Sequence, residues 1–430
     1  MTAKEFYTIF LRNPQVCTDS RNITPGCLFF ALTGDSFNGN LFAADALSSG
    51  ASFAVVDDPA VVSGSNYTLV KNVLEFLQEL ASFHRSQLNI PVVALTGTNG
   101  KTTTKELIQS VLKQQYRVVG TSGNLNNHIG VPLTLLSAGP ETEILVVEMG
   151  ANHPGEIAFL CDIARPTHGL ITNVGKAHLE GFGSFDGVVV TKSELFRFVS
   201  RTGGTWFLNS DDEHLSAIAG DYPSITYGSD GSPSVKGIAE AGGYQLAASV
   251  SLPDQSEFVA KTSLTGNYNL YNVLAAAAVG YQFGMSAVKI RAGIEGYMPS
   301  NMRSQWKVTA GNRLLLDAYN ANPSSMALAI RHFASLNLPM SVLILGDMFE
   351  LGNESAVEHA EIVRLVRTFS FHAVYLAGKE FFNCARGPGL QAFPDTESLI
   401  AELQRNPLQG CTILVKGSRG MKLEKSLNYL

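Results

Sequence analysis

The chain has 430 residues, of which 45% are hydrophobic and 16% charged, and its formal net charge is -6. At about 100 to 200 residues per domain, this length predicts two to four domains, and we take three as the working number. The composition excludes a disordered chain, and the negative charge excludes a broad basic surface for nucleic acid or anionic membranes.

Signals for export or membrane insertion are missing from the sequence. The N-terminal residues lack a basic stretch followed by a long apolar region, and no run of about 18 apolar residues occurs. We therefore expect a cytoplasmic protein with no stable membrane insertion. The five cysteines are scattered and never spaced as CxxC, which favours reduced structural thiols, and no cysteine and histidine group has zinc-site spacing.

The first predicted domain covers residues 1–86. Short strand-like runs at 27–32 and 51–57 alternate with glycine-rich turns, and an apolar periodic stretch at 72–84 indicates a helix. These elements fit a small α/β unit.

The second predicted domain covers residues 87–299. From Pro91 onward, buried strands alternate with helical patterns, which is typical of a parallel sheet covered on both faces. Residues 220–263 are polar and alternating, closer to hairpins than to βαβ units, and we interpret them as an excursion within this domain. A helix resumes at 269–284.

The third predicted domain covers residues 300–430. A new series of strands and helices begins with the strand-like residues 313–319 and ends with 412–418. This pattern predicts a small Rossmann-like sheet. The fold class is thus α/β with three domains, of which the central one is a P-loop, parallel-sheet, ATPase-like domain and the last is Rossmann-like.

A phosphate-binding loop is the sharpest local signal. It lies between the strand-like residues 91–95 and a helical pattern, and it comprises Gly97, Thr98, Asn99, Gly100, Lys101, Thr102 and Thr103. Glycines let the backbone approach phosphates, the helix N-terminus supplies N–H groups, Lys101 adds a charge and Thr102 can ligate Mg²⁺. Leu95 replaces the first glycine of the common pattern, and an ordinary turn is the alternative.

Further candidates are weaker when taken alone. Glu148 ends an apolar strand at the edge where ligands of open α/β sheets collect, so it is a candidate Mg²⁺ ligand. His178 and Lys192 would more often be a locally bonded histidine and a solvent-facing lysine. Asn269 and Asn272, three apart on one helix face, fit nucleotide contacts or a helix cap. Polar stretches at 317–323, 345–352 and 415–420 follow buried strands and predict a second substrate face.

Together these motifs resemble the Mur ligase family, whose members extend the peptide of bacterial cell-wall precursors. The residues TGTNGKTTT are similar to the family's phosphate loop, and that variant form accounts for Leu95. The segments that resemble the member adding D-alanyl-D-alanine are 123–136, 148–157, 173–184, 317–323, 345–352 and 416–420. Residues 19–42 resemble the uridine-nucleotide domain, so the likeness covers essentially the whole chain.

The resemblance implies roles in an ATP and magnesium site. Lys101 and Thr102 would hold the ATP phosphates and a first Mg²⁺, with Glu148 completing that site. His178 and a carbamylated Lys192 would serve a second Mg²⁺. The positions expected to contact ATP from the central and third domains are Asn272, Arg303 and Asp317.

For the precursor, the resemblance implies that Ser20 and Arg21 contact the uridine diphosphate and that Asn126 and Asn127 hold the rest of the molecule. The chain departs from the family's pattern at two places. Residues 36–40 replace an acidic residue and a histidine around the glycine, and His128 replaces a glutamate.

The implied reaction joins UDP-N-acetylmuramoyl-tripeptide to D-alanyl-D-alanine through an acyl phosphate, with ATP consumed and no protein nucleophile. We expect a monomer. Alternatives are a related Mur ligase or folylpolyglutamate synthase with another substrate and, in a different class, a P-loop nucleotide-switch binding protein.

Overall fold

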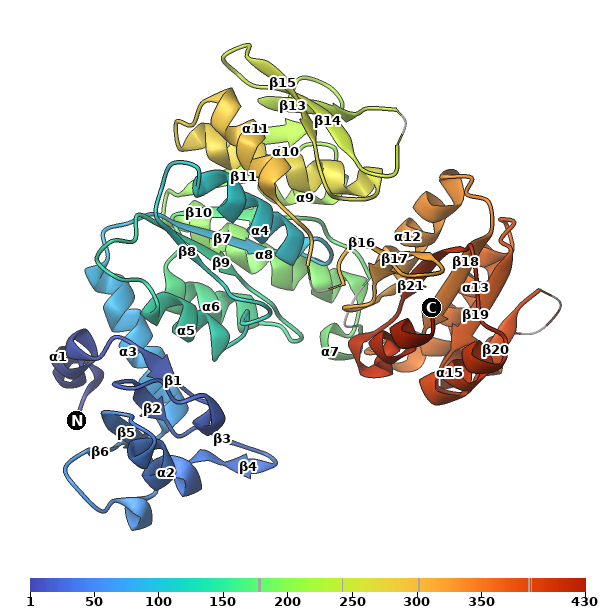
Figure 1. Ribbon diagram of the computed structural model, residues 1–430. Helices are drawn as coiled ribbons and strands as arrows, with labels where there is room; N and C mark the ends of the chain where they lie inside the picture. The colour runs from blue at the N-terminus through green and yellow to red at the C-terminus, as the bar shows by residue number, and fades with distance from the viewer. Residues whose placement is uncertain (177–178, 242, 301, 386, 388) are drawn as a thin grey trace.

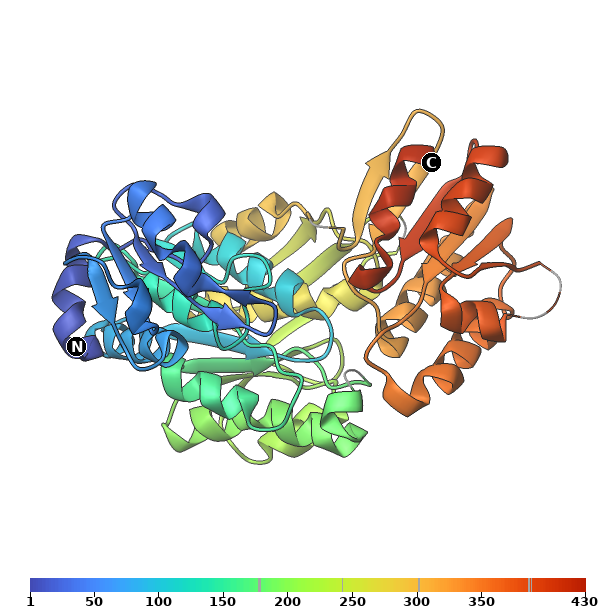
Figure 2. The same cartoon turned by 90° about the horizontal axis from the view of Figure 1, so that it is seen from below.

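The structure is a computed structural model that describes residues 1–176, 179–241, 243–300, 302–385, 387 and 389–430. Three α/β domains, each built on one large β-sheet, follow one another along the chain, with the first and last on either side of the central one (Figures 1 and 2). The predicted α/β class with three domains is confirmed, while the exact borders at 86/87 and 299/300 stay predictions. Within the described ranges, no helix combines the length and apolarity needed to cross a membrane.

The N-terminal domain contains a parallel sheet of four strands in the order β1-β2-β5-β6, namely β1 (Val16–Cys17), β2 (Leu28–Phe30), β5 (Phe53–Val56) and β6 (Tyr67–Leu69). Its helices are α1 (Ala3–Arg12), α2 (Ala43–Ser48) and α3 (Val73–Gln87), and the hairpin β3 (Thr33–Gly34) and β4 (Phe37–Asn38) leaves the sheet. Asn72 caps α3 by accepting a hydrogen bond from the Glu75 N–H.

The central domain is built on a nine-stranded sheet in the order β15-β14-β13-β12-β11-β10-β7-β9-β8. The strands are β7 (Val92–Thr96), β8 (Val118–Gly120), β9 (Ile144–Glu148), β10 (His168–Ile171), β11 (Thr205–Asn209), β12 (Ser224–Gly228), β13 (Val235–Ala239), β14 (Ala247–Ser251) and β15 (Glu257–Lys261). The helices are α4 (Lys101–Leu112), α5 (Gly130–Leu136), α6 (Glu156–Ala164), α7 (Leu179–Phe182), α8 (Phe185–Arg201), α9 (Glu213–Ala219), α10 (Leu270–Gln282) and α11 (Ala287–Gly296).

The polar region 220–263 was expected to be an excursion within the central domain, and its strands in fact belong to the central sheet. β12 pairs in parallel with both β11 and β13, whereas β14 pairs antiparallel with both β13 and β15, so the region extends the central sheet itself. The hairpin expectation therefore holds for β13 to β15. Alternation between exposed and buried residues arises because this end of the sheet is covered on one face.

Both faces of the parallel part are covered, as the continuous apolar strands predict. Along β7, Val92 and Ala94 pack into one core with α5, α6 and α8, whereas Val93 and Leu95 pack into another with α4, α10 and α11. This division follows from the alternation of side chains along a strand. The first core continues into the N-terminal domain through α3.

The C-terminal domain has a six-stranded sheet in the order β16-β17-β21-β18-β19-β20, in which only β16 is antiparallel to its neighbour. Its strands are β16 (Gln305–Val308), β17 (Arg313–Asp317), β18 (Ser341–Gly346), β19 (Ala373–Ala377), β20 (Gln391–Phe393) and β21 (Thr412–Lys416). The helices α12 (Pro323–Ser335), α13 (Ser355–Val366), α14 (Lys379–Cys384) and α15 (Thr396–Arg405) complete it. All five cysteines of the chain are free thiols, as expected.

Candidate active site

The phosphate loop connects β7 to α4, and its two glycines are required by its shape. Gly97 has φ 143°, and a Cβ there would lie 2.0 Å from Thr172 Oγ1. Gly100 has φ 79° and is the N-cap residue directly before α4, where a Cβ would lie 2.7 Å from Asn272 Oδ1. Both positions therefore exclude other residues. The open N-terminus of α4 is a ready anion site because its first N–H groups have no helical partners.

Lys101 lies at the first turn of α4 and is half-buried. Its Nζ donates to the carbonyl oxygens of Gly97 at 2.6 Å and Thr98 at 3.0 Å. Desolvation lowers the pKa of Lys101, while the nearby Glu148 carboxylate opposes that shift. The ammonium is thus held across the loop where transferred phosphates would lie.

Glu148 ends β9 directly beside the loop and is 1% exposed. Its Oε1 accepts hydrogen bonds from Thr102 Oγ1 at 3.2 Å and from Asn126 Nδ2 at 2.8 Å. Its Oε2 is buried with no hydrogen-bond partner among the described residues. A carboxylate oxygen that accepts no hydrogen bond, close to the Thr102 hydroxyl, fits Mg²⁺, which is commonly held by one or two carboxylates together with substrate phosphates. The described residues contain no cluster of three His, Cys, Asp or Glu suited to a metal, so phosphate oxygens would complete this coordination.

Asn272 and Asn269 lie behind the loop rather than capping a helix. Asn272 Oδ1 accepts from Thr104 Oγ1 at 2.9 Å, and its Nδ2 donates to Asn269 Oδ1 at 2.8 Å. Asn269 occupies the N-cap position directly before α10, but its side chain makes no capping hydrogen bond. The pair therefore fixes α10 against the phosphate loop.

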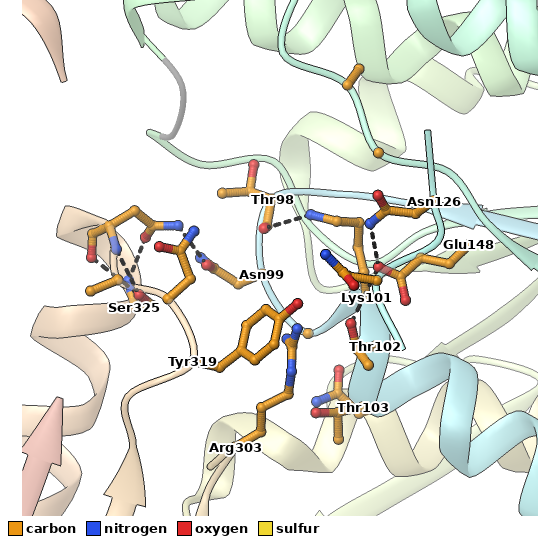
Figure 3. A pocket seen from close by; sticks show the side chains of 18 of the residues that line it. Thr98, Asn99, Lys101, Thr102, Thr103, Asn126, Glu148, Arg303, Tyr319 and Ser325 are labelled. Carbon is orange, nitrogen blue, oxygen red and sulfur yellow. Dashed lines mark hydrogen bonds between the residues drawn. The ribbon is translucent and has the colours of Figure 1, made fainter. Parts of the chain in front are cut away.

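A pocket of about 510 Å³ opens between the central and C-terminal domains above this loop (Figure 3). The predicted site residues that line it are Thr98, Asn99, Gly100, Lys101, Thr102, Thr103, Asn126, Asn127, Glu148, Asn272, Arg303 and Asp317. Predicted residues from the two domains are thus brought together in one place.

The C-terminal wall of the pocket is formed by cations, an aromatic ring and amides. The Arg303 guanidinium lies 3.7 Å from the Tyr319 ring centre, and both side chains face the phosphate loop in Figure 3. Arg303 Nε is buried without a hydrogen-bond partner among the described residues. Asp317 Oδ2 accepts from Lys416 Nζ at 2.5 Å, while Asp317 Oδ1 accepts from the Ser304 N–H at 3.2 Å.

Lys192 and His178 were predicted as a second metal site. Lys192 projects from α8, is 2% exposed, and lies 5.4 Å from the Phe182 ring centre. Burial lowers its pKa to about 7, and the positive charge of Lys101 adds to the shift. The sequence-based alternative of a solvent-facing lysine is wrong. His178 lies outside the described residues.

Ser20 and Arg21 lie in the N-terminal domain and do not line the pocket. Arg21 is exposed, and its guanidinium donates to both carboxylate oxygens of Asp19 at 2.8 and 2.7 Å. This ion pair holds the pKa of Asp19 at about 2. The two residues predicted to contact uridine diphosphate therefore lie apart from the pocket that contains the phosphate loop.

Three further residues were not singled out from the sequence. Tyr319 and Lys416 belong to polar stretches that were recognised, but nothing in the sequence separated them from their neighbours. Lys105 is buried, with Nζ 3.8 Å from Glu148 Oε2. Its position four residues after Lys101, on the same helix face, was an available signal.

Comparisons with known proteins cover nearly the whole chain. Family models described as "Mur ligase family, catalytic domain", "Mur ligase middle domain" and "Mur ligase, glutamate ligase domain" match residues 15–85, 95–280 and 302–419 respectively.

Similar curated proteins include two named UDP-N-acetylmuramoyl-tripeptide–D-alanyl-D-alanine ligase. The one from Bacillus subtilis (strain 168) is 33% identical over 98% of this chain and 95% of its own length. The one from Escherichia coli (strain K12) is 35% identical over 96% of this chain and 93% of its own length.

Similar solved structures include a crystal structure of MurF from Acinetobacter baumannii, with a TM-score of 0.88 and 29% identity over 99% of this chain and 98% of that one. A structure of MurF ligase from Thermotoga maritima in complex with ADP has a TM-score of 0.85 and 27% identity, with 97% of each chain covered. The chain belongs to the Mur ligase family.

Proposed function

We propose that this protein is an ATP-dependent ligase that joins D-alanyl-D-alanine to UDP-N-acetylmuramoyl-tripeptide through an acyl phosphate. The observation that carries the proposal is the pocket in which the phosphate loop and Glu148 face Arg303 and Asp317 of another domain. The names of full-length relatives at 33% and 35% identity supply the substrates. The use of ATP is supported by the similar MurF structure with ADP.

The first step would transfer the terminal phosphoryl group of ATP to the terminal carboxylate of the tripeptide. An oxygen of that carboxylate bonds to phosphorus, the bond to the ADP oxygen breaks, and ADP leaves. Lys101 and Arg303 offer cationic groups on two sides of the pocket, and Thr102 and Glu148 would hold Mg²⁺, which neutralises phosphate charge when bound. Asn272 keeps the loop and α10 in register.

The second step would be attack of the dipeptide amine on the acyl phosphate carbon. The C–N bond forms, the C–O bond to phosphate breaks, phosphate leaves with the electron pair, and the amine loses a proton. A carboxylate alone cannot react in this way because it would have to expel oxide. The protein's part is to align the reactants and exclude water, which requires no protein nucleophile.

Precursor binding would use residues other than those proposed to hold ATP. We propose that Asn126 and Asn127, which line the pocket, contact the precursor, and that Ser20 and Arg21 of the N-terminal domain contact its uridine diphosphate. This division assumes domains of residues 1–86, 87–299 and 300–430.

Lys192 is proposed to act as a carbamate with His178 at a second Mg²⁺. Its neutral amine would add to carbon dioxide, forming an N–C bond and releasing a proton, and the anionic product offers oxygen ligands suited to Mg²⁺. Burial at 2% exposure and a pKa of about 7 favour the neutral amine that this addition needs. A carbamate signal in ¹³C NMR after ¹³C-bicarbonate labelling, absent in Lys192→Met, would test it; equal spectra would contradict it.

Two alternatives are separable by substrate. A related ligase acting on another amine or carboxylate would share the ATP pocket but use different substrates. A nucleotide-switch protein would hydrolyse ATP without an amine or a carboxylate substrate. The cytoplasmic location and the monomeric state stay predictions.

The test is phosphate release by the purified protein with each substrate omitted in turn. We expect turnover only when ATP, UDP-N-acetylmuramoyl-tripeptide and D-alanyl-D-alanine are all present. Rapid release with glutamate and a folate in their place, or release independent of the precursor, would contradict the proposal.

A further inference from the structure

Lys105 is a buried cation that the proposed chemistry does not use. It lies on α4 one turn after Lys101, and its side chain is 1% exposed. Lysine is rarely buried without partners, because its charge loses hydration. Here Nζ donates to the carbonyl oxygen of Thr121 at 2.8 Å and to that of Gly123 at 3.3 Å.

Two carboxylates lie near the same ammonium. Nζ is 3.8 Å from Glu148 Oε2 and 3.8 Å from Glu106 Oε1, beyond hydrogen-bond length in both cases. The two carbonyl oxygens therefore fix the position of the ammonium, while the carboxylates balance its charge. Lys105 does not line the pocket, and its ammonium contacts the backbone of a segment that also contains lining residues.

The bonded carbonyls belong to residues 121–127, which we call the asparagine segment because it carries Asn126 and Asn127. Four hydrogen bonds join this segment to β9 and the two residues after it, and one of them runs from the Thr121 N–H to the Val146 carbonyl oxygen at 3.0 Å. The Glu148 N–H donates to Thr121 Oγ1 at 3.0 Å, Asn126 Nδ2 donates to Glu148 Oε1 at 2.8 Å, and the Gly150 N–H donates to the Asn126 carbonyl at 2.7 Å. The segment thus touches the candidate metal ligand directly.

We propose that Lys105 is a positioning residue that joins the phosphate-loop helix to the asparagine segment and so sets the distance between nucleotide and precursor sites. This inference rests on the proposed function, since it takes Asn126 and Asn127 as precursor contacts. A helix is a rigid support, whereas residues 121–127 contain no regular secondary structure. Without the ammonium, the carbonyls of Thr121 and Gly123 lose their donor. The segment then keeps its bonds to the β9 side and the bonds of Asn127 Oδ1, which accepts from the Ile129 and Gly130 N–H groups at the start of α5.

The experiment compares Lys105→Met with Lys113→Met, which removes an exposed lysine at the end of the same helix. Binding of UDP-N-acetylmuramoyl-tripeptide is measured by calorimetry without ATP, after circular dichroism has shown that each variant is folded. We expect Lys105→Met to weaken precursor binding by about tenfold or more and Lys113→Met to change it by less than about twofold. Hydrogen exchange should accelerate in residues 121–127, and the Michaelis constant for D-alanyl-D-alanine should stay unchanged.

Lys105→Gln keeps one amide donor without the charge, and we expect precursor binding between that of wild type and Lys105→Met. If Lys105→Met does not fold, Lys105→Gln carries the test by the same criterion. A folded variant that binds the precursor as tightly as wild type, with unchanged exchange in residues 121–127, would overturn the inference. A wild-type protein that binds no precursor would contradict the proposed function instead.

Discussion

Asn322 donates a 2.8 Å hydrogen bond from its Nδ2 to Asn99 Oδ1, and so connects the C-terminal domain to the phosphate loop. The same side chain caps α12, because its Oδ1 accepts from the Ser325 N–H at 2.9 Å. Asn322 therefore both caps the N-terminus of α12 and makes a hydrogen bond between two domains. A second contact, the 2.8 Å ion pair of Lys176 with Glu358, joins the same two domains.

The two roles of Asn322 can be separated by substitution. Asn322→Asp keeps a capping oxygen but loses the donor to Asn99 and adds negative charge near the phosphates, so we expect a higher Michaelis constant for ATP at unchanged melting temperature. Asn322→Ala loses both roles, with the cap alone worth about 1 kcal/mol of folding stability. ATP kinetics and thermal unfolding measure the two effects. Wild-type ATP kinetics in Asn322→Asp would show that the contact with Asn99 has no part in ATP binding.

Lys101→Ala should lower ligation by about 10² to 10³, the cost of removing one preorganised group that stabilises transition-state charge. Its bonds go to the Gly97 and Thr98 carbonyls of its own loop, so the global fold should persist. Phosphate release measures the loss of activity, and circular dichroism shows whether the fold persists. Lys113→Ala, on the same helix, is the matched control and should retain activity. Full turnover in folded Lys101→Ala would refute the assignment of the phosphate loop.

Asp317→Ala should impair both ATP use and stability. It removes the partner of Lys416, whose side chain is 2% exposed, and stranding such a charge costs on the order of 3 kcal/mol. Asp317→Asn retains an acceptor for Lys416, so we expect a smaller loss of stability with a similar rise in the ATP Michaelis constant. Denaturant unfolding and ATP kinetics distinguish these effects. An unaltered ATP Michaelis constant and turnover in both variants would remove Asp317 from the site.

Much of the fold was predictable because its signals are local. Alternation of apolar strands with helices from Pro91 predicted a parallel sheet, and β7 indeed divides its side chains between two cores. The placement of residues 220–263 was less predictable, since the pattern of β14 and β15 indicates a hairpin but not the sheet that it extends. Strand order depends on long-range pairing that periodicity does not encode.

The site was predictable where chemistry follows a short motif, and less so where it depends on contacts between domains. The phosphate loop from Gly97 to Thr103 was predicted from spacing. The spacing of Asn272 left a nucleotide contact and a helix cap both open, and a role for Asp317 in ATP binding came only from the family resemblance. The ion pair of Lys416 with Asp317 depends on the pairing of β17 with β21, which the sequence pattern does not predict. Lys192 shows a further limit, because a lysine in an amphipathic helix ordinarily faces water and only tertiary packing buries it.

Lys192 also predicts a pH dependence of stability. Its pKa is about 7 in the folded protein and 10.5 when unperturbed, so between these values the unfolded chain binds a proton that the folded protein has released. Stability of the carbon dioxide-free protein should therefore rise with pH through this window, by up to about 1.4 kcal/mol per pH unit, and level off outside it. Urea unfolding of wild type and Lys192→Met from about pH 6 to about pH 10 isolates this contribution, because the variant keeps the other titrating groups. The expected result is a difference between the two proteins that grows in favour of wild type as the pH rises. Parallel stability curves across the whole range would show that Lys192 titrates normally and is not buried as an amine.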